Sequence, residues 1–488
     1  MEVNYDEDVI AKSTNRTEEE TTGITSSNGE LLISRRSRKC TQYLAAFIVT
    51  VGAFAVGNVV AWSAPASREL QLKFKFTLSQ VSWISSFMVL GSGASVMPTG
   101  YLVDKFGRKS VMLALTIPFV GGWALIAWAN TWALFCAGRF ITGMACGAYA
   151  ISAPIYICEI AETGIREMLG TCFQLMINVG VVFAYVLGRE LDIFWSSIVC
   201  GVVPIIYGIM FAFMPETPVY YMHKGMEDEA KTSLFWLQGP DCDVEEELLQ
   251  IGRNCDDNDG ATKDAQSSRT AKVAFFIAIG LMSFQQLCGI NAVIFYTTDI
   301  FHFVGSSIEP SICTIIVGAI QVIASLCTSL LVGVLGCRIL LLISSFVMFI
   351  CMYLLGLFFY LQGKYGMSYI IDIEWLPLVS ICLYVAVYSF GFGPVPCIMM
   401  SVLFPRHIKG FASSVTCFLS TVLGFVIAKF FSDLIENVGI ASTFWLFSVL
   451  TAIGSVFVFF VVPETRGKSL EVLQRELAGE DSRDALRS

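Results

Sequence analysis

Long apolar segments dominate this chain and restrict what it can fold into. A helix needs about 20 mostly apolar residues to cross the hydrocarbon core of a bilayer. Twelve segments of the sequence meet that length, near residues 43–64, 81–103, 110–130, 132–156, 168–189, 193–214, 271–295, 311–334, 339–361, 375–402, 410–435 and 440–462. Backbone polar groups in lipid must be bonded internally, so we expect each segment to be a helix. The predicted fold class is an all-α polytopic membrane protein with twelve transmembrane helices.

The composition agrees with this prediction and excludes other classes of protein. Only 15% of the residues are charged and the mean hydropathy is +0.68, whereas soluble proteins have about 25% charged residues. The sequence has no basic patch with interleaved aromatic residues, so we expect no nucleic-acid partner. The three histidines (His223, His302 and His407) do not cluster. We therefore predict no catalytic residues, no metal, no cofactor and no enzyme activity.

One long polar interruption, at 215–270, divides the chain into two sets of six spans. The predicted domains are a disordered tail at 1–40, a six-helix half at 41–214, a loop with short helices at 215–270, a second six-helix half at 271–465, and a tail at 466–488. Lys and Arg are more frequent in the short loops on the side of the two termini. Such an excess marks the cytosolic side. We therefore expect both tails and the central loop to be cytosolic.

The two halves share a repeated motif. The second span is followed by GYLVDKFGRKSVML at 100–113, and the eighth is followed by LLVGVLGCRILLLI at 330–343. Both have a glycine and a basic residue at the same spacing. Repeats of six spans are typical of secondary transporters, in which the substrate lies near mid-membrane between the halves. We therefore expect two halves related by pseudo-two-fold symmetry.

Several motifs carry a family resemblance. GYLVDKFGRKS resembles the loop motif of the major facilitator superfamily. Others resemble signatures of its sugar porter branch, namely PIYICEIAETGIREMLGT (154–171), PETPVYYMHKG (215–225), FQQLCGINAVIFYT (284–297), GFGPVP (391–396) and PETRGKSLE (463–471). The resemblance covers about 40–480 in the right order. Within that branch the chain looks most like insect-type trehalose or glucose facilitators.

The resemblance implies facilitative (uniport) transport of a sugar, either trehalose or a hexose such as glucose, across the plasma membrane by alternating access. The expected partners are a small-molecule sugar and the lipid bilayer, and the expected state is a monomer. Proton symporters of this branch carry a carboxylate in the first span, where this chain has Asn58 as its polar candidate. Two alternatives stay open: a proton-coupled symporter, and a sensor that binds sugar without moving it.

Five carboxamides inside the spans are the candidate substrate-binding residues: Gln174, Gln285, Gln286, Asn291 and Gln321. Each amide offers two donors and an acceptor, which suits vicinal hydroxyls. In the resembling family these positions hold the sugar. On an ideal helix Gln285 and Asn291 would lie about 240° apart. Gly289 between them permits a break, so we expect an interrupted span in which the amides converge.

Charged residues at the expected cytosolic ends are the candidate gating residues. They are Asp104, Arg108, Lys109, Glu159, Arg166, Glu216, Arg338, Lys409 and Glu464. In the resembling family such residues form a salt-bridge cluster that holds the inner side shut. The second half departs from the family pattern at Gly333, Cys397, Val402, Ser420 and Thr421. Because the acidic partners there are missing, we predict an inner gate that depends on Asp104, Glu159 and Arg166.

Overall fold

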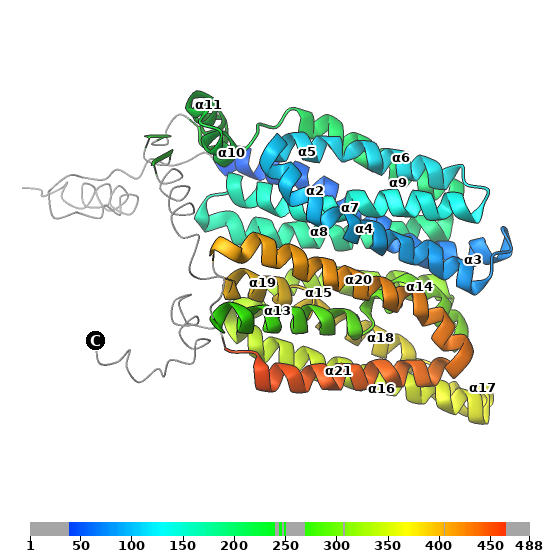
Figure 1. Ribbon diagram of the computed structural model, residues 1–488. Helices are drawn as coiled ribbons and strands as arrows, with labels where there is room; N and C mark the ends of the chain where they lie inside the picture. The colour runs from blue at the N-terminus through cyan, green and yellow to red at the C-terminus, as the bar shows by residue number, and fades with distance from the viewer. Residues whose placement is uncertain are drawn as a thin grey trace, which may run out of the picture.

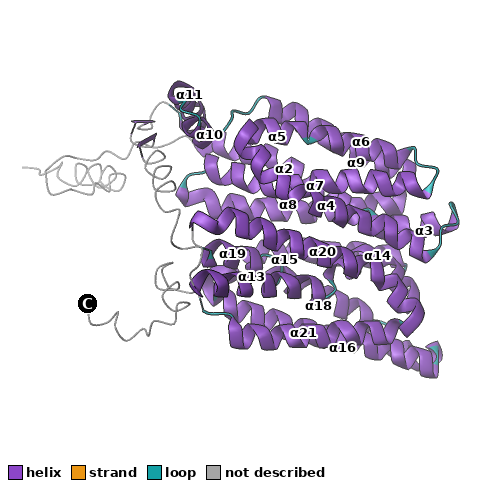
Figure 2. Cartoon of the chain, viewed as in Figure 1, coloured by secondary structure: helices purple, strands orange, loops and turns teal. Residues whose placement is uncertain are grey.

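The computed structural model describes residues 39–239, 244–245, 248–249, 269–305, 308–404 and 406–464. The predictions for 1–38 and 465–488, and for most of 240–268, lie outside the described residues. Within the described part the chain is helical without strands (Figure 2). Twelve of its helical segments are long and apolar enough to cross a membrane, which confirms the predicted fold class.

The helices follow one another with short connections. The N-terminal half contains α2 (Lys39–Ala61), α3 (Ser63–Leu72), α4 (Leu78–Phe106), α5 (Arg108–Ala114), α6 (Thr116–Ala127), α7 (Trp132–Ile160), α8 (Thr163–Glu190) and α9 (Ile193–Ala212). Between the halves lie α10 (Pro218–His223) and α11 (Glu227–Gln238). The C-terminal half contains α13 (Arg269–Leu287), α14 (Ile290–Val304), α15 (Pro310–Leu335), α16 (Cys337–Tyr365), α17 (Met367–Ile370), η1 (Ile371–Ile373), α18 (Leu376–Phe390), α19 (Val395–Leu403), α20 (Arg406–Val438) and α21 (Ile440–Val461).

The two halves lie side by side as two bundles (Figure 1). The N-terminal half meets the C-terminal half where α4 packs against α20, α8 against α15, and α3 against α14. Helices α10 and α11 lie at one end of the molecule, which we call the α10 end. Helices α3 and α17 lie at the other, which we call the α3 end (Figure 1).

Two spans of the C-terminal half are broken. Helix α13 ends at Leu287, and Gly289 has the left-handed backbone angle φ 89° before α14 begins. Helix α18 ends at Phe390, and the chain passes through the GFGP segment 391–394 before α19 begins. Such breaks free backbone carbonyl groups, which need partners within the protein. The Tyr384 hydroxyl on α18 donates to the Cys288 carbonyl at 3.0 Å. A side chain of one broken span thus bonds a carbonyl at the break in the other.

The internal repeat is visible in the backbone. Gly107, before α5, has φ 92° and ψ 158°, and Gly336, before α16, has φ 83° and ψ 156°. These glycines are the equivalent residues of the two repeated motifs. A residue with a side chain rarely adopts such positive φ values. The same turn therefore joins the second span to the third in each half.

The central loop begins with helices that pack on the N-terminal half. Thr217 caps α10 by accepting the Tyr220 amide hydrogen, and Pro218 occupies the first turn. Helix α11 buries Leu234 and Leu237. The Thr41 hydroxyl donates to the Leu237 carbonyl at 2.6 Å, which ties α11 to the start of α2.

Helices α2 and α8 approach closely through small residues, as is common in membranes. A Cβ atom on Gly180 would collide with the carbonyl oxygen of Phe54, and one on Gly57 would collide with that of Ile177. These backbones leave no room for a side chain.

We expect Gly180→Ala to lower the thermal stability of the purified protein in detergent. Overpacking of this kind destabilises by about 1–3 kcal/mol. Gly121→Ala is the matched control, because a Cβ atom at Gly121 meets nothing within 4 Å and alanine gains the same helix propensity. Thermal unfolding followed by intrinsic fluorescence compares the two. A Gly180→Ala protein as stable as the control would contradict the close packing.

Candidate functional site

A cavity of about 320 Å³ lies between the two halves. Its lining residues are Gln174 and Asn178 from α8, Gln285 and Gln286 from α13, Ile290 and Asn291 from α14, Gln321 and Ser325 from α15, Tyr388 and Ser389 from α18, and Gly393, Pro394 and Cys397 around the second break. All five carboxamides that the sequence singled out are among them. Pockets that bind small molecules have volumes of about 300–1,000 Å³, so this cavity is large enough to be a binding site.

The break at Gly289 brings the amides of α13 and α14 together. The Asn291 side chain donates to Gln286 Oε1 at 2.7 Å, and Gln286 Nε2 donates to the Ser420 hydroxyl at 3.1 Å. Gly424 permits this approach, because a Cβ atom there would lie 2.8 Å from Asn291 Nδ2. Ser420 is one of the residues at which the second half departs from the family pattern, and its hydroxyl holds Gln286 in place. These amides are therefore fixed by one another before any ligand binds.

Gln285 bonds to the backbone of the second broken span. Its Nε2 donates to the carbonyl oxygens of Phe392 at 2.7 Å and Gly393 at 3.0 Å. These carbonyls lie in the segment between α18 and α19, where a continuous helix would have bonded them. Gln285 thus has a structural role as well as a place on the cavity wall.

Gln174 and Gln321 differ from the other three. Neither side-chain amide has a hydrogen-bond partner in the described part of the chain, although Gln321 is only 7% exposed. Both amides are therefore available to a ligand in the cavity, one from each half of the molecule.

The sequence predictions missed polar cavity residues. Asn178 and Ser325 line the cavity beside Gln174 and Gln321, and Tyr388 lies on the wall formed by α18. Asn178 follows Gln174 by four residues, and Ser325 follows Gln321 by four. Residues at that spacing share a helix face, so the sequence held a signal that would have identified both.

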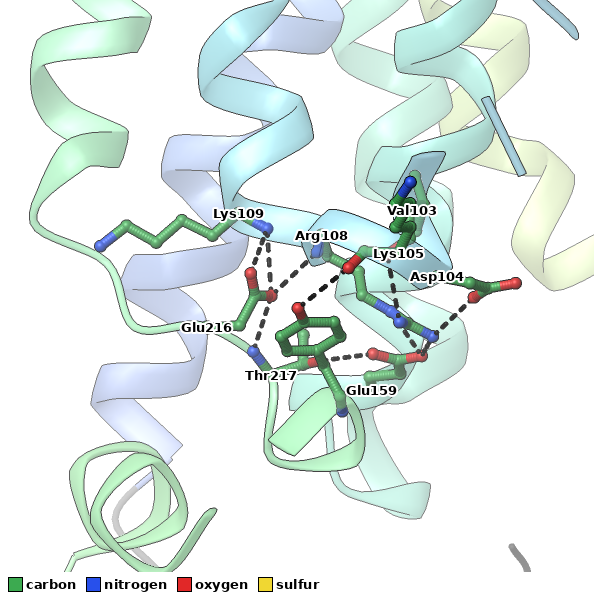
Figure 3. Close-up of polar contacts among 9 residues, drawn as sticks. Val103, Asp104, Lys105, Arg108, Lys109, Glu159, Glu216 and Thr217 are labelled. Atoms are coloured by element: carbon green, nitrogen blue, oxygen red, sulfur yellow. Dashed lines mark hydrogen bonds and ion pairs between the residues drawn. The ribbon is translucent and has the colours of Figure 1, made fainter. Parts of the chain in front are cut away.

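A charged cluster occupies the α10 end of the N-terminal half (Figure 3). Arg108 Nη2 lies 2.9 Å from Glu159 Oε1 and 3.5 Å from Asp104 Oδ1. The Thr217 hydroxyl donates to Glu159 Oε2 at 2.6 Å. Arg108 is 7% exposed, so its ion pair with Glu159 is screened far less than a surface pair would be.

Glu216 joins the start of α5 to the central loop. Its carboxylate accepts the backbone N–H of Arg108 at 3.1 Å and that of Lys109 at 2.9 Å. A carboxylate is favourable at a helix N-terminus, where such N–H groups have no other partner. A Cβ atom on Gly107 would collide with this carboxylate. The positive φ and the close approach of Glu216 together explain the glycine of the repeated motif.

The other predicted gating residues lie outside this cluster. Arg166 is exposed and donates to the Ala161 carbonyl at 3.2 Å. The Lys109 ammonium points away from the cluster (Figure 3). Arg338 donates to the Phe459 carbonyl at 2.6 Å. Lys409 lies in the first turn of α20 and Glu464 at the end of the described chain.

Within the described residues, every partner of the clustered charges belongs to the N-terminal half or to the central loop. The cluster therefore does not connect the halves in this conformation. Of the three residues on which the inner gate is predicted to depend, Glu159 and Asp104 pair with Arg108, and Arg166 donates to the Ala161 carbonyl.

Contacts between the halves gather at the α3 end. The Ser67 hydroxyl on α3 donates to the buried carboxylate of Asp299 on α14 at 2.6 Å. Arg189 Nη2 lies 3.2 Å from Glu309 Oε2. The Lys429 ammonium on α20 lies 5.1 Å from the ring centroid of Trp83 on α4. These polar and cation–π contacts join the two halves at the α3 end.

Asp299 and Lys429 were not among the predicted site residues. Both are charged residues inside candidate spans, with 8% and 5% exposure. Charged residues at such positions are rare and usually functional. That rule, applied to the predicted span 410–435, would have identified Lys429, whereas Asp299 lies beyond the predicted end of the span 271–295.

Comparison with known proteins agrees with this geometry. The family model "Sugar (and other) transporter" matches residues 21–477. The chain is 37% identical over 449 residues to the facilitated trehalose transporter Tret1 of Polypedilum vanderplanki, covering 90% of this chain and 88% of that protein. It is also 37% identical to Tret1 of Aedes aegypti, covering 90% of this chain and 55% of that longer protein.

Solved structures share the fold. The inward-open xylose transporter XylE from E. coli matches with a TM-score of 0.76 and 21% identity, covering 89% of this chain and 99% of that one. Its partially occluded inward-open form matches with a TM-score of 0.75. Since the family model spans most of the sequence and these relatives align along it, the chain belongs to the family of sugar (and other) transporters.

Proposed function

We propose that this protein is a facilitative uniporter that carries trehalose or a hexose such as glucose across the plasma membrane, as a monomer with both termini in the cytosol. The observation that carries the proposal is the cavity between the halves, with its convergent amides. None of the described residues that line it is charged, so it suits a neutral ligand. Amide donors and acceptors match the hydroxyl groups of a sugar. Relatives named facilitated trehalose transporters support trehalose as the first candidate.

Alternating access would use the two ends of the bundle differently. With the termini in the cytosol, the α3 end faces outward, and its contacts between the halves form the outer gate. The charged cluster around Arg108 lies on the cytosolic side and has no partner in the other half within the described chain. This asymmetry supports a conformation whose outer side is closed. Opening outward would break the Ser67–Asp299 and Arg189–Glu309 contacts.

The first span supports uniport. Arg139 on α7 donates to the Val59 carbonyl at 2.7 Å and to the Ser63 hydroxyl at 2.8 Å. Beside them lies Asn58, whose buried side-chain amide has no partner among the described residues. Helix α2 contains no carboxylate, and the acid nearest to it in this span, Glu69, lies near the end of α3 and pairs with Lys73. Proton coupling needs a group that binds and releases a proton, which neither an asparagine nor an arginine supplies at neutral pH.

Asp299 is the observation that favours a second candidate, a proton-coupled sugar symporter. Its carboxylate is buried inside the seventh span and lies in the contact between the halves. An acid within a span is a common element of proton relays. However, Asp299 does not line the cavity, so the uniporter remains the leading proposal.

We expect saturable uptake of radiolabelled trehalose or glucose by purified protein in proteoliposomes, at the same rate with and without a protonophore. Gln174→Leu should raise the KM about tenfold, because a lost hydrogen bond to the ligand is worth about 1.4 kcal/mol. Accumulation above the external concentration that the protonophore abolishes would identify a symporter. Sugar binding without uptake would identify a sensor.

Charge reversal at Glu159 should reduce uptake at least about tenfold, because Glu159→Lys leaves the buried Arg108 beside a second cation, and a broken buried pair costs about 3–5 kcal/mol. Asp372→Lys is the control, since Asp372 is an exposed acid in the C-terminal half. Uptake rates and melting temperatures are measured for both variants. Unchanged uptake by a folded Glu159→Lys protein would show that Glu159 is not part of the gate.

A further inference from the structure

The cavity wall contains a direct hydrogen bond between the halves. The Asn178 amide on α8 donates to the Ser325 hydroxyl on α15. The Ser325 hydroxyl in turn donates to the carbonyl oxygen of Gln321 at 2.9 Å. Asn178 is 2% exposed, yet both it and Ser325 line the cavity. This bond therefore lies at the border between the packed contact of α8 with α15 and the open space of the cavity.

The packing of α8 on α15 does not depend on this bond. Toward the α3 end the same two helices meet at Gly318, where a Cβ atom would lie 3.0 Å from Val182 and 3.1 Å from Tyr185. The Tyr185 hydroxyl also donates to the Ile294 carbonyl on α14 at 3.2 Å. Close contact between α8 and α15 at Gly318, and a hydrogen bond from α8 to α14, therefore already hold the two halves together here. A polar pair at the cavity border is not needed for that contact.

The distribution of lining residues gives Asn178 particular weight. Of the described residues that line the cavity, Gln174 and Asn178 come from the N-terminal half and all the others from the C-terminal half. A ligand that is to couple to the movement of the halves must contact both. Gln174 has no protein partner in the described part of the chain, whereas the Asn178 amide already bonds to Ser325. Of the two amides that the N-terminal half contributes to the cavity, one is thus already bonded to a serine hydroxyl.

We propose that Asn178 is a sugar-contacting specificity residue and that Ser325 competes with a sugar hydroxyl for its amide. The inference rests on the proposed sugar transport and names a further contact of that same site. The exchange replaces one hydroxyl acceptor with another, so the Asn178 amide keeps a partner throughout, as a buried amide must. The sugar then takes the place of a direct bond between the halves. A bound sugar thereby favours states in which the halves are separated at this point. A ligand shifts such an equilibrium when it binds one of the two states, here the one without the Asn178–Ser325 bond, more tightly.

This competition predicts opposite effects for its two members. Asn178→Leu keeps a side chain of similar size but removes the amide, so the KM for trehalose or glucose uptake should rise about tenfold. Ser325→Ala removes the competitor, so the KM should fall by about 2- to 5-fold. In the double variant the KM should equal that of Asn178→Leu, since Ser325 has nothing left to compete for. Initial rates of radiolabelled trehalose and glucose uptake in proteoliposomes give the KM values.

Ser344→Ala is the matched control. Ser344 is a buried serine that donates to the Val387 carbonyl at 2.8 Å and does not line the cavity, so its loss should leave the KM unchanged. If Asn178→Leu and Ser325→Ala shift the KM in the same direction, or lower only the melting temperature, the pair is a contact between helices and the inference is wrong. If the wild-type protein neither binds nor takes up either sugar, the proposed function fails and the inference fails with it.

Discussion

Polar groups at membrane depth need partners inside the protein, and the centre of this structure follows from that constraint. Breaks at Gly289 and at the GFGP segment free backbone carbonyls in two neighbouring spans of the C-terminal half. Gln285 and Tyr384 bond those carbonyls across the two spans. The remaining amides then pair with one another or face the cavity. The cavity between the halves therefore lies where the irregular backbone of the two broken spans is stabilised.

The two ends of the bundle differ in the kind of contact they hold. Charges at the α10 end pair within the N-terminal half and with the central loop, where Glu216 and Glu159 fix the turn before α5. Contacts at the α3 end pass from one half to the other through Asp299 and Lys429. Relative motion of the halves would leave the first set intact and break the second. The contacts at the α10 end thus keep the N-terminal half rigid, whereas those at the α3 end form an interface between the halves that can open.

Much of the architecture could be predicted from the sequence, because membrane depth imposes a strong length and hydropathy signal on every span. The break at Gly289 was also predictable, since Gln285 and Asn291 could not otherwise converge. What could not be predicted is which partner each polar group selects: Gln285 bonds a backbone carbonyl, and Arg166 lies apart from Glu159. The partner of each polar group depends on how helices that are distant in the sequence pack together, and local sequence patterns do not contain that information.

Opening of the α3 end is the central claim, and a reversible cross-link between Arg189→Cys and Glu309→Cys tests it most directly. These exposed positions lie on opposite halves, 3.2 Å apart between their charged atoms in the closed state. A short membrane-impermeant thiosulfonate linker should join them, stop sugar uptake, and release it again on reduction, while each single variant treated alike keeps transporting. Uptake at the full rate by the cross-linked protein would contradict the account, because sugar would then pass without this end opening.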